Sequence, residues 1–387
     1  ASPMDLKLSE DGLTLIECEI KSHSDLKGYP KDGLPKLGTY HYNLHLPEGY
    51  HDNPNEDYPL IIIASPGGKA KMGKMAEVIK KNRWIAAMLV ESSNKGSWTV
   101  MAGNEVAAFD DLKKRVRCKD GFIFSTGMSG GSRAATQLIS MRKGLGGVIL
   151  QAAAFWYTPS AYYQHQYKEL NPKATWYGLF GDGDYNMKEL SQVYSNIPYQ
   201  QLKVEVYKGG HGWAPTESIS RAFDWQIEQN LLKSKYKSSN KGIYQWYSNL
   251  LQSQIEESQN DFQSYELKGN LIDFTKRFKI KADSELKEKL TTYKSDIKTQ
   301  TKDFKNELSA KKMYAAAESY EVKTQAKLKG LKDVKPVLEA FEKKYLDITK
   351  KYNETHYSKI SQTRANALHL HIHHKPKSPP SKKKKKK

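Results

Sequence analysis

One serine of this chain lies in a pattern that could make it a nucleophile. Residues 127–131 read Gly-Met-Ser-Gly-Gly, with Ser129 at the centre. A serine hydroxyl attacks well only when it is exposed to substrate beside a base, and a Gly-x-Ser-x-Gly turn places it there by reversing a strand sharply into a helix. The sequence predicts the strand over residues 121–126 and the helix from residue 132 onward. We therefore interpret Ser129 as a candidate nucleophile; the alternative is a Gly-rich turn without chemistry.

A base and an acid follow in the chain order expected for this turn, with the acid before the histidine. His211 comes just after the apolar stretch 202–207, which places it on a loop at the same sheet edge as Ser129. The acid, which would fix the imidazole tautomer and stabilise the imidazolium, is expected after the preceding strand, where Asp182 and Asp184 both occur. We favour Asp184 and keep Asp182 as the second choice. We do not expect a metal at this pair, because a Ca²⁺ loop needs more oxygen ligands.

The negative oxygen of a tetrahedral intermediate needs two backbone N–H donors in a water-poor pocket, an oxyanion hole. Gly130, the residue after the nucleophile, is expected to supply one donor. The second is expected from the Ser-Pro-Gly-Gly loop after the apolar run 60–64. Because Pro66 has no N–H, the donor there would be Gly67 or Gly68.

Strand and helix signals alternate over residues 1–235, which predicts an α/β domain. The run at 60–64 is apolar throughout, as in a strand buried on both faces of a parallel sheet. The expected strands are 13–20, 39–46, 60–64, 85–90, 121–126, 147–152, 175–180 and 202–207. The expected helices are 71–81, 104–116, 132–141, 187–196 and 216–232.

The chain changes character after residue 235. Lys and Arg number 28 against 25 Asp and Glu up to that point, and 34 against 18 beyond it. Charged amphipathic patterns without strand signals predict a basic helical region over 236–365, and the His- and Lys-rich composition of 366–387 predicts a disordered tail. The excess charge could hold an anionic polymer or an envelope surface, whereas a solvated face is the plainer alternative. No specific nucleic-acid motif is present.

Two cysteines, Cys18 and Cys118, are too few for a disulfide framework, and we expect free thiols. No run reaches the roughly 18 apolar residues that a membrane-spanning helix needs. The start Ala-Ser-Pro, without Met, is compatible with a processed secretory precursor. We expect a secreted or periplasmic protein, and otherwise a cytoplasmic one.

Six short segments of the sequence resemble the α/β-hydrolase superfamily: 40–50, 58–60, 65–68, 126–131, 181–184 and 211–213. Within the superfamily they most resemble the secreted serine esterases of the polyhydroxybutyrate-depolymerase or feruloyl-esterase-like branch. The resemblance covers residues 13–232 and implies an α/β-hydrolase fold, a carboxylic-ester hydrolase with a Ser-His-Asp triad, and no cofactor. Such proteins usually have His-Gly where this chain has Ser65-Pro66, a departure beside the second oxyanion donor.

Only residues 153–173 separate two of the expected strands, too few for a cap domain, so we expect an open site. Several aromatic residues are expected near the site, and aromatic faces suit sugars and aryl esters. The alternative is that these side chains only pack under the loops. We expect a bulky carbohydrate-linked or aryl ester as substrate. Two other functions stay open: a serine peptidase of the prolyl-oligopeptidase type, which usually carries a large extra N-terminal domain, and a non-catalytic binding protein that keeps the fold. The aromatic residues expected around the site are Trp98, Trp156 and Trp213, with Phe155, Tyr157, Tyr162 and Tyr163 as a short lip.

Overall fold

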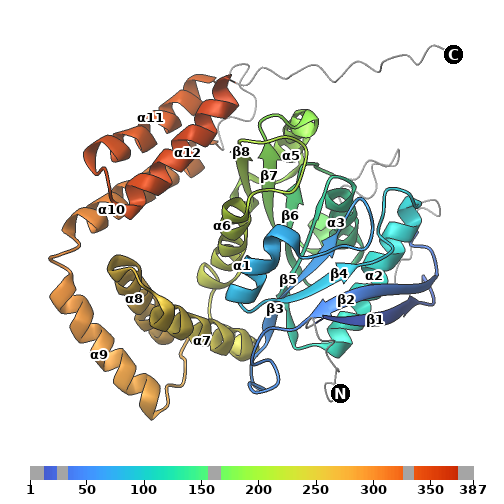
Figure 1. Ribbon diagram of the computed structural model, residues 1–387, viewed down its shortest axis with the longest axis horizontal. Coiled ribbons are helices and arrows are strands. Elements are labelled where there is room, and N and C mark those ends of the chain that lie inside the picture. The colour runs from blue at the N-terminus through green and yellow to red at the C-terminus, as the bar shows by residue number, and fades with distance from the viewer. Residues whose placement is uncertain (1–12, 24–33, 156–166, 326–334, 374–387) are drawn as a thin grey trace.

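A computed structural model describes residues 13–23, 34–155, 167–325 and 335–373, in which eight strands form one sheet (Figure 1). The strand order is β1-β2-β4-β3-β5-β6-β7-β8. β2 runs antiparallel to both β1 and β4, and all neighbours from β4 to β8 are parallel. This order and these directions are those of the α/β-hydrolase fold, so the predicted fold is confirmed. The strands are β1 (Leu13–Ile20), β2 (Gly38–His45), β3 (Tyr58–Ala64), β4 (Ile85–Leu89), β5 (Cys118–Met128), β6 (Leu145–Gln151), β7 (Thr175–Gly181) and β8 (Leu202–Tyr207).

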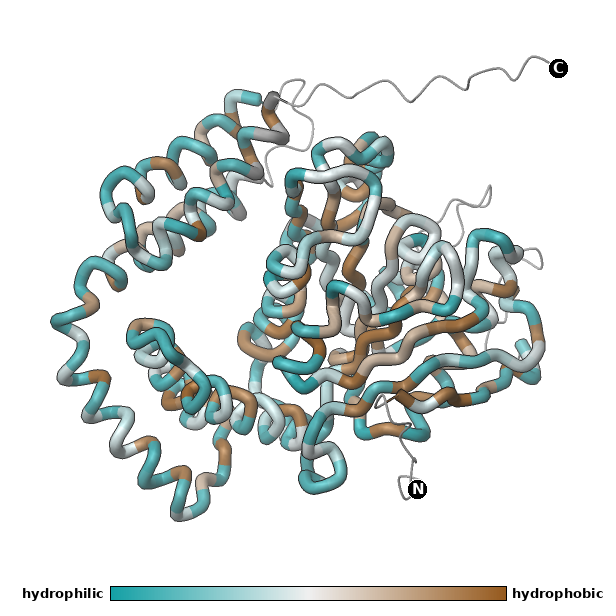
Figure 2. The backbone as a smooth tube through the Cα atoms, in the orientation of Figure 1, coloured by the Kyte–Doolittle hydropathy of each residue, from teal (hydrophilic) through white to brown (hydrophobic). Residues whose placement is uncertain are grey.

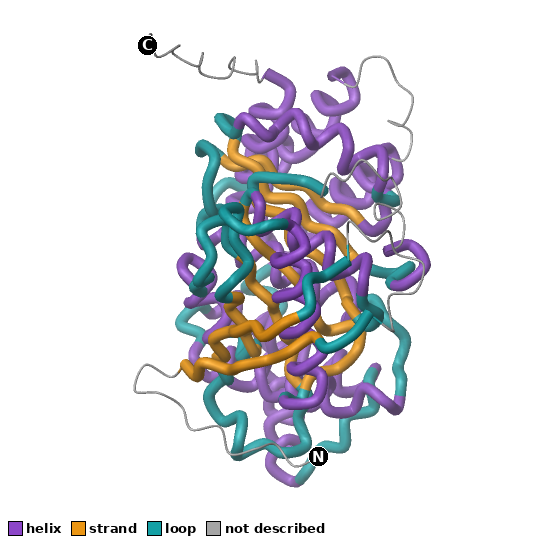
Figure 3. Tube along the Cα trace, turned by 90° about the vertical axis from the view of Figure 1, so that its right-hand side faces the viewer, coloured by secondary structure: helices purple, strands orange, loops and turns teal. Residues whose placement is uncertain are grey.

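Helices lie on both faces of this sheet, and the side view shows the strands as a twisted layer between them (Figures 1 and 3). α1 and α6 pack together on one face, and α2 and α3 on the other. Ser97 caps α2 by accepting a hydrogen bond from Val100 N at 3.3 Å, so this helix begins at Trp98 and not at residue 104. The helices of this part are α1 (Ala76–Lys81), α2 (Trp98–Arg115), α3 (Gly130–Met141), α5 (Leu190–Asn196) and α6 (Thr216–Ile227).

The burial of each strand follows its place in the sheet. β3, β6 and β7 are buried along their whole length, because helices cover both of their faces. β1 and β2, at one edge, alternate buried and more exposed residues. Cys18 on β1 and Cys118 on β5 are separated by three strands and are both free thiols, as predicted.

The hydrophobic core continues beyond the predicted boundary at residue 235. α7 (Lys241–Glu257) and α8 (Asp261–Arg277) contribute to the same cluster of buried side chains as the sheet. Trp246 of α7 is fully buried, and its Nε1 donates to the backbone oxygen of Arg83 at 3.2 Å. Gly242 lies so close to the loop before β3 that a Cβ there would be 2.3 Å from Asp57 Oδ2. The end of the hydrolase core therefore lies within the region predicted to be a separate appendage.

The last three helices build a second, smaller core around Phe341, Tyr345 and Ile348. These helices are α10 (Lys305–Gln325), α11 (Lys335–Lys351) and α12 (His356–His373), and α9 (Ser284–Gln300) leads to them from α8. The tube coloured by hydropathy shows mostly hydrophilic residues along α9, in contrast to the brown central strands (Figure 2). Because α12 extends to His373, the boundary predicted at residue 366 falls inside a helix.

The second core docks on β8, the strand at the other edge of the sheet. Arg364 of α12 donates to Val204 O at 3.4 Å and forms an ion pair with Glu321 of α10. Burial would raise the pKa of Glu321, but the adjacent Arg364 charge and the hydrogen bonds from Arg364 and Tyr345 lower it below its ordinary value. A buried donor thus satisfies the outer carbonyl of an edge strand, which would otherwise be open to pairing with another chain.

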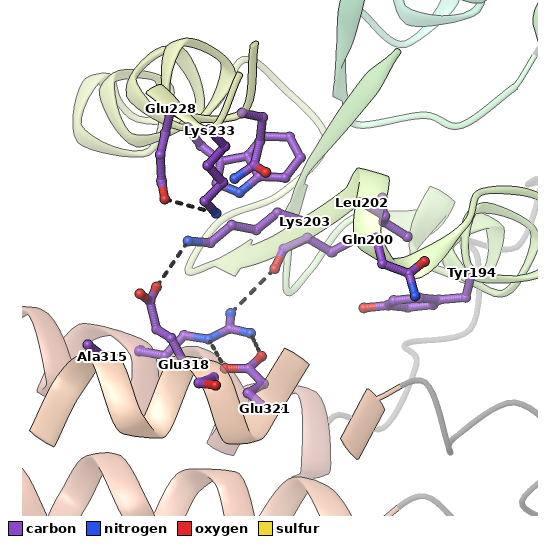
Figure 4. A pocket seen from close by; sticks show the side chains of 14 residues that line it. Tyr194, Gln200, Leu202, Lys203, Glu228, Lys233, Ala315, Glu318 and Glu321 are labelled. Carbon is purple, nitrogen blue, oxygen red and sulfur yellow. Dashed lines mark hydrogen bonds and ion pairs between the residues drawn. The ribbon is translucent and has the colours of Figure 1, made fainter. Parts of the chain in front are cut away.

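A cavity of about 370 Å³ lies at this contact, lined by β8, α6, α10 and α12 (Figure 4). Lys203 pairs with Glu318 at 3.6 Å, and Lys233 pairs with Glu228 at 2.9 Å. Arg364 pairs with Glu321. Each cation of the lining has an acidic partner, so no unbalanced charge is left to attract an ion, and we assign no ligand to this cavity.

Candidate functional site

Ser129 occupies the sharp turn between β5 and α3. Its backbone has φ 56° and ψ −115°, a conformation that a non-glycine residue adopts only when its surroundings impose it. The turn is tight: a Cβ on Gly127 would lie 2.3 Å from the carbonyl carbon of Gly131, and one on Gly131 would lie 2.4 Å from Ala64 O. Gly127 and Gly131, two of the three glycines of the pentapeptide, are therefore required by close backbone contact, and the strained backbone conformation lies at the serine.

His211 and Asp184 lie together, as predicted from the sequence. His211 Nδ1 and Asp184 Oδ1 are 2.9 Å apart, and the Asp184 side chain is fully buried. The same oxygen accepts from Asn186 N at 2.8 Å, which holds the carboxylate in place. Within the described parts of the chain, His211 uses only Nδ1 for hydrogen bonding, so Nε2 is available to a substrate or a nucleophile.

Asp182 hydrogen-bonds to the backbone beside the histidine loop rather than to the imidazole. Its Oδ1 accepts from Gly209 N at 2.8 Å and so ties the end of β7 to the loop that carries His211. Asp182 N also donates to Tyr207 O at 2.8 Å. Of the two aspartates predicted as candidates, the structure pairs Asp184 with the imidazole and uses Asp182 to shape the loop.

Tyr185 covers the imidazole, a feature that the sequence analysis missed. Its ring centroid is 4.2 Å from that of His211, with an interplanar angle of 32°, and the residue is 56% exposed. A tyrosine directly after the acid gives no periodic or motif signal by which it could have been found. Its exposed ring forms one wall beside the histidine, where a substrate would approach.

The candidate oxyanion donors differ in the hydrogen bonds that their backbone N–H groups already make. Gly68 N donates to Ser65 O at 3.0 Å and closes the turn of its loop. Among the described residues, Gly67 N has a single long contact, 3.4 Å to Ser65 Oγ, and a Cβ at Gly67 would have no neighbour within 4 Å. Gly130 is the first residue of α3, where backbone N–H groups have no partner within the helix. The geometry therefore favours Gly130 and Gly67 over Gly68 as donors.

Gln151, the last residue of β6, connects the serine turn to the histidine loop. Its backbone oxygen accepts from Ser129 N at 2.9 Å, and its side-chain Oε1 accepts from Ala214 N, three residues after His211, at 3.2 Å. Its Nε2 donates to Thr126 Oγ1 on β5 at 3.1 Å. Gln151 is fully buried, so these bonds are shielded from water. One residue thus contacts the serine turn through its backbone oxygen and the histidine loop through its side chain.

We expect Gln151→Met to lower kcat at least about 10-fold at nearly constant KM, because small displacements of a catalytic group are costly. Methionine fills the same volume but cannot hydrogen-bond Ala214 N. Steady-state kinetics on a p-nitrophenyl ester would measure the change, with Gln263→Met, at an exposed position of α8, as the matched control. An unchanged kcat in Gln151→Met would show that backbone contacts alone hold the two loops.

Three of the seven predicted aromatic residues lie among the described residues. Trp98, 37% exposed, stands at the start of α2, and Trp213 is partly buried next to the histidine loop. Phe155 is wrong as a lip residue: it is buried against Tyr167 and Trp176 because the chain turns inward after β6. Trp156, Tyr157, Tyr162 and Tyr163 lie outside the described residues.

Over the described residues, no group of three or more His, Cys, Asp and Glu side chains lies close enough to hold a metal ion. None of the helices in that part of the chain is both long enough and apolar enough to cross a bilayer.

No family model and no curated protein matches the sequence. Among solved structures, a ferulic acid esterase matches 56% of this chain and 98% of its own, at 12% identity and a TM-score of 0.40. Est1E from Butyrivibrio proteoclasticus matches 49% of this chain and 95% of its own, at 15% identity and a TM-score of 0.37. Thermogutta terrifontis esterase 2 matches 53% of this chain and 94% of its own, at 10% identity and a TM-score of 0.40. At such identities, any activity of this chain has to be argued from its own site.

Proposed function

We propose that this protein is a serine hydrolase that cleaves carboxylic esters through an acyl-enzyme at Ser129. The observation that carries the proposal is the hydrogen bond between His211 Nδ1 and the buried Asp184, at the same sheet edge as the strained Ser129. An acid that orients a histidine beside a serine held at a strand-to-helix turn is the arrangement that activates a serine hydroxyl.

In the first half of the reaction, Ser129 Oγ attacks the ester carbonyl carbon while His211 Nε2 takes the hydroxyl proton. The carbonyl electron pair moves to oxygen, where Gly130 N–H and Gly67 N–H would stabilise the negative charge. The tetrahedral intermediate then collapses, the C–O bond to the alcohol breaks, and the alcohol leaves with the proton from His211. The acyl group stays on Ser129.

In the second half, a water molecule gives a proton to His211 Nε2 and attacks the acyl carbon. The new intermediate expels Ser129 Oγ, which recovers the proton from His211, and the carboxylic acid is released. The Asp184 carboxylate stabilises the imidazolium that forms in both halves. No cofactor is required by these steps.

An aryl or carbohydrate-linked ester is the substrate class that we propose. Two exposed aromatic rings support it: Tyr185 against His211, and Trp98, the first residue of α2. Flat apolar faces with a polar tip suit sugar rings and aryl groups. Only residues 152–174 connect β6 to β7, which favours a site open to bulky substrates.

The test is covalent labelling with a fluorophosphonate probe, which reacts with activated serines. We expect the parent protein to form one adduct, Ser129→Ala to form none, and Ser284→Ala, a control at an exposed serine of α9, to behave as the parent. Hydrolysis of methyl ferulate, acetylated xylan and a matched anilide would then assign the substrate class. Absence of a Ser129-dependent adduct in the parent would sink the enzyme proposal, and faster turnover of the anilide than of the esters would favour a peptidase.

A further inference from the structure

The side chain of Asn94 lies directly against Gly130, the residue after the candidate nucleophile. A Cβ built on Gly130 would be 1.7 Å from Asn94 Oδ1, 2.6 Å from its Cγ and 3.0 Å from its Nδ2. The carboxamide therefore occupies the space that any side chain at position 130 would need. Asn94 comes from the loop between β4 and α2, far from Ser129 in the sequence.

This contact explains why position 130 is a glycine. Gly130 begins a regular helix and is not among the described residues with positive φ, so its backbone conformation is open to other amino acids. Gly127 and Gly131 are excluded from having a side chain by backbone atoms, whereas at Gly130 the obstacle is another polar side chain. The glycine makes room for the carboxamide.

The backbone of Asn94 is anchored to the second candidate oxyanion loop. Asn94 N donates to Pro66 O at 2.9 Å, and Ser93 Oγ donates to the same oxygen at 3.4 Å. Ser93 also forms an isolated antiparallel bridge with Gly67. Asn94 is thus held by the loop that carries Gly67 and touches the residue that supplies the other backbone donor.

The Asn94 carboxamide is also available to hydrogen-bond a bound substrate. Asn94 is exposed, and its side chain makes no hydrogen bond with another described residue. An asparagine side chain carries two N–H donors and one acceptor, and a half-turn about its last torsion exchanges them. A bound ester would cover this side chain and exclude water, which strengthens any hydrogen bond that it makes.

We propose that Asn94 Nδ2 donates a third hydrogen bond to the oxyanion, beside Gly130 N–H and Gly67 N–H. The inference rests on the proposed serine-hydrolase function and adds a side-chain donor to a hole that otherwise consists of backbone groups. It also gives the Ser-Pro-Gly-Gly loop a second purpose, because Pro66 O fixes the residue that carries the donor.

The first experiment measures kcat and KM on a p-nitrophenyl ester for Asn94→Ala, Asn94→Asp and the neighbouring control Lys95→Ala. Removing one oxyanion donor lowers kcat by about 10²–10³-fold in enzymes that use one. We expect Asn94→Ala to lose roughly 100-fold in kcat with KM changed less than about 3-fold. Asn94→Asp should lose at least as much, because a carboxylate cannot donate and repels the oxyanion, and Lys95→Ala should match the parent.

The second experiment uses a boronic acid, whose tetrahedral adduct on Ser129 imitates the charged intermediate. We expect its affinity to fall in Asn94→Ala by about the same factor as kcat/KM. A double-mutant cycle with Gly130→Ala adds a further check, since a methyl group at position 130 displaces the carboxamide. The loss in Gly130→Ala should largely disappear when Asn94 is already alanine.

The outcomes separate this inference from the function on which it rests. If turnover depends on Ser129 but Asn94→Ala keeps a kcat within about 3-fold of the parent, Asn94 is no oxyanion donor. A change confined to KM would instead make it a ground-state substrate contact. If the parent shows no Ser129-dependent turnover at all, the proposed function itself fails. Urea unfolding of each variant tests whether the substitution leaves the fold intact.

Discussion

Asp184→Asn is expected to lower kcat for ester hydrolysis by about 10³–10⁴-fold, or about 4–5 kcal/mol of transition-state stabilisation. Asparagine keeps the size of the side chain and can still accept from Asn186 N. It removes the negative charge beside His211 Nδ1 and allows the amide to hold the wrong imidazole tautomer. Steady-state kinetics with the parent and the variant, on the ester that turns over fastest, would measure this loss.

Asp182→Asn is the matched control for this prediction. Its Oδ1 accepts from Gly209 N, and an asparagine oxygen can do the same, so we expect kcat within about 10-fold of the parent. The reverse ranking of the two variants would show that Asp182 takes over the imidazole when substrate is bound. Equal and small losses would mean that neither carboxylate assists His211.

Raising the pH is expected to destabilise the protein through Glu105, in the middle of α2. This side chain is 1% exposed, and neither carboxylate oxygen has a hydrogen-bond partner among the described residues. Burial raises the pKa of Glu105 from 4.5 to about 8, since the charged form would be left without solvent or partner. The folded state therefore keeps a proton that the unfolded state releases.

The direction of the effect follows from proton linkage. Below pH 4.5 both states carry the neutral acid, and burial of Glu105 has no pH-dependent cost. Between pH 4.5 and about 8 the unfolded state binds fewer protons, so the free energy of unfolding falls by up to about 1.4 kcal/mol per pH unit. Above that range the loss is complete, on the order of 5 kcal/mol.

Glu105→Gln is expected to remove this dependence. Urea unfolding at several pH values between 4 and 9 would give the difference in unfolding free energy between variant and parent, in which the contributions of all other groups cancel. That difference should grow in favour of the variant by roughly 5 kcal/mol across the range. Glu48→Gln, at an exposed position, should show a constant difference. A constant difference for Glu105→Gln as well would mean that the carboxylate reaches water or a partner in solution.

Much of the hydrolase part could be predicted from local pattern. β3 appears in the sequence as a short apolar run, β8 as a short stretch rich in apolar residues, and the serine pentapeptide together with its flanking strand and helix signals marks one strand end. The packing of the helices after residue 235 was harder to predict from the sequence. Their amphipathic pattern shows one apolar face but not the surface on which it packs, so the sequence predicts an appendage there. The structure instead packs α7 and α8 into the hydrolase core.

The sequence by itself determined which residues make up the proposed catalytic site. Residue type and order were sufficient for Ser129, His211 and a choice of two aspartates, because a strand-to-helix turn and the ends of parallel strands bring loops to one edge whatever lies between them. The tertiary structure decided everything that depends on contacts across the chain. It paired Asp184 rather than Asp182 with the imidazole, joined both loops through Gln151, and placed Asn94 in the space left by Gly130. Those contacts connect residues tens of positions apart, and no local periodicity encodes them.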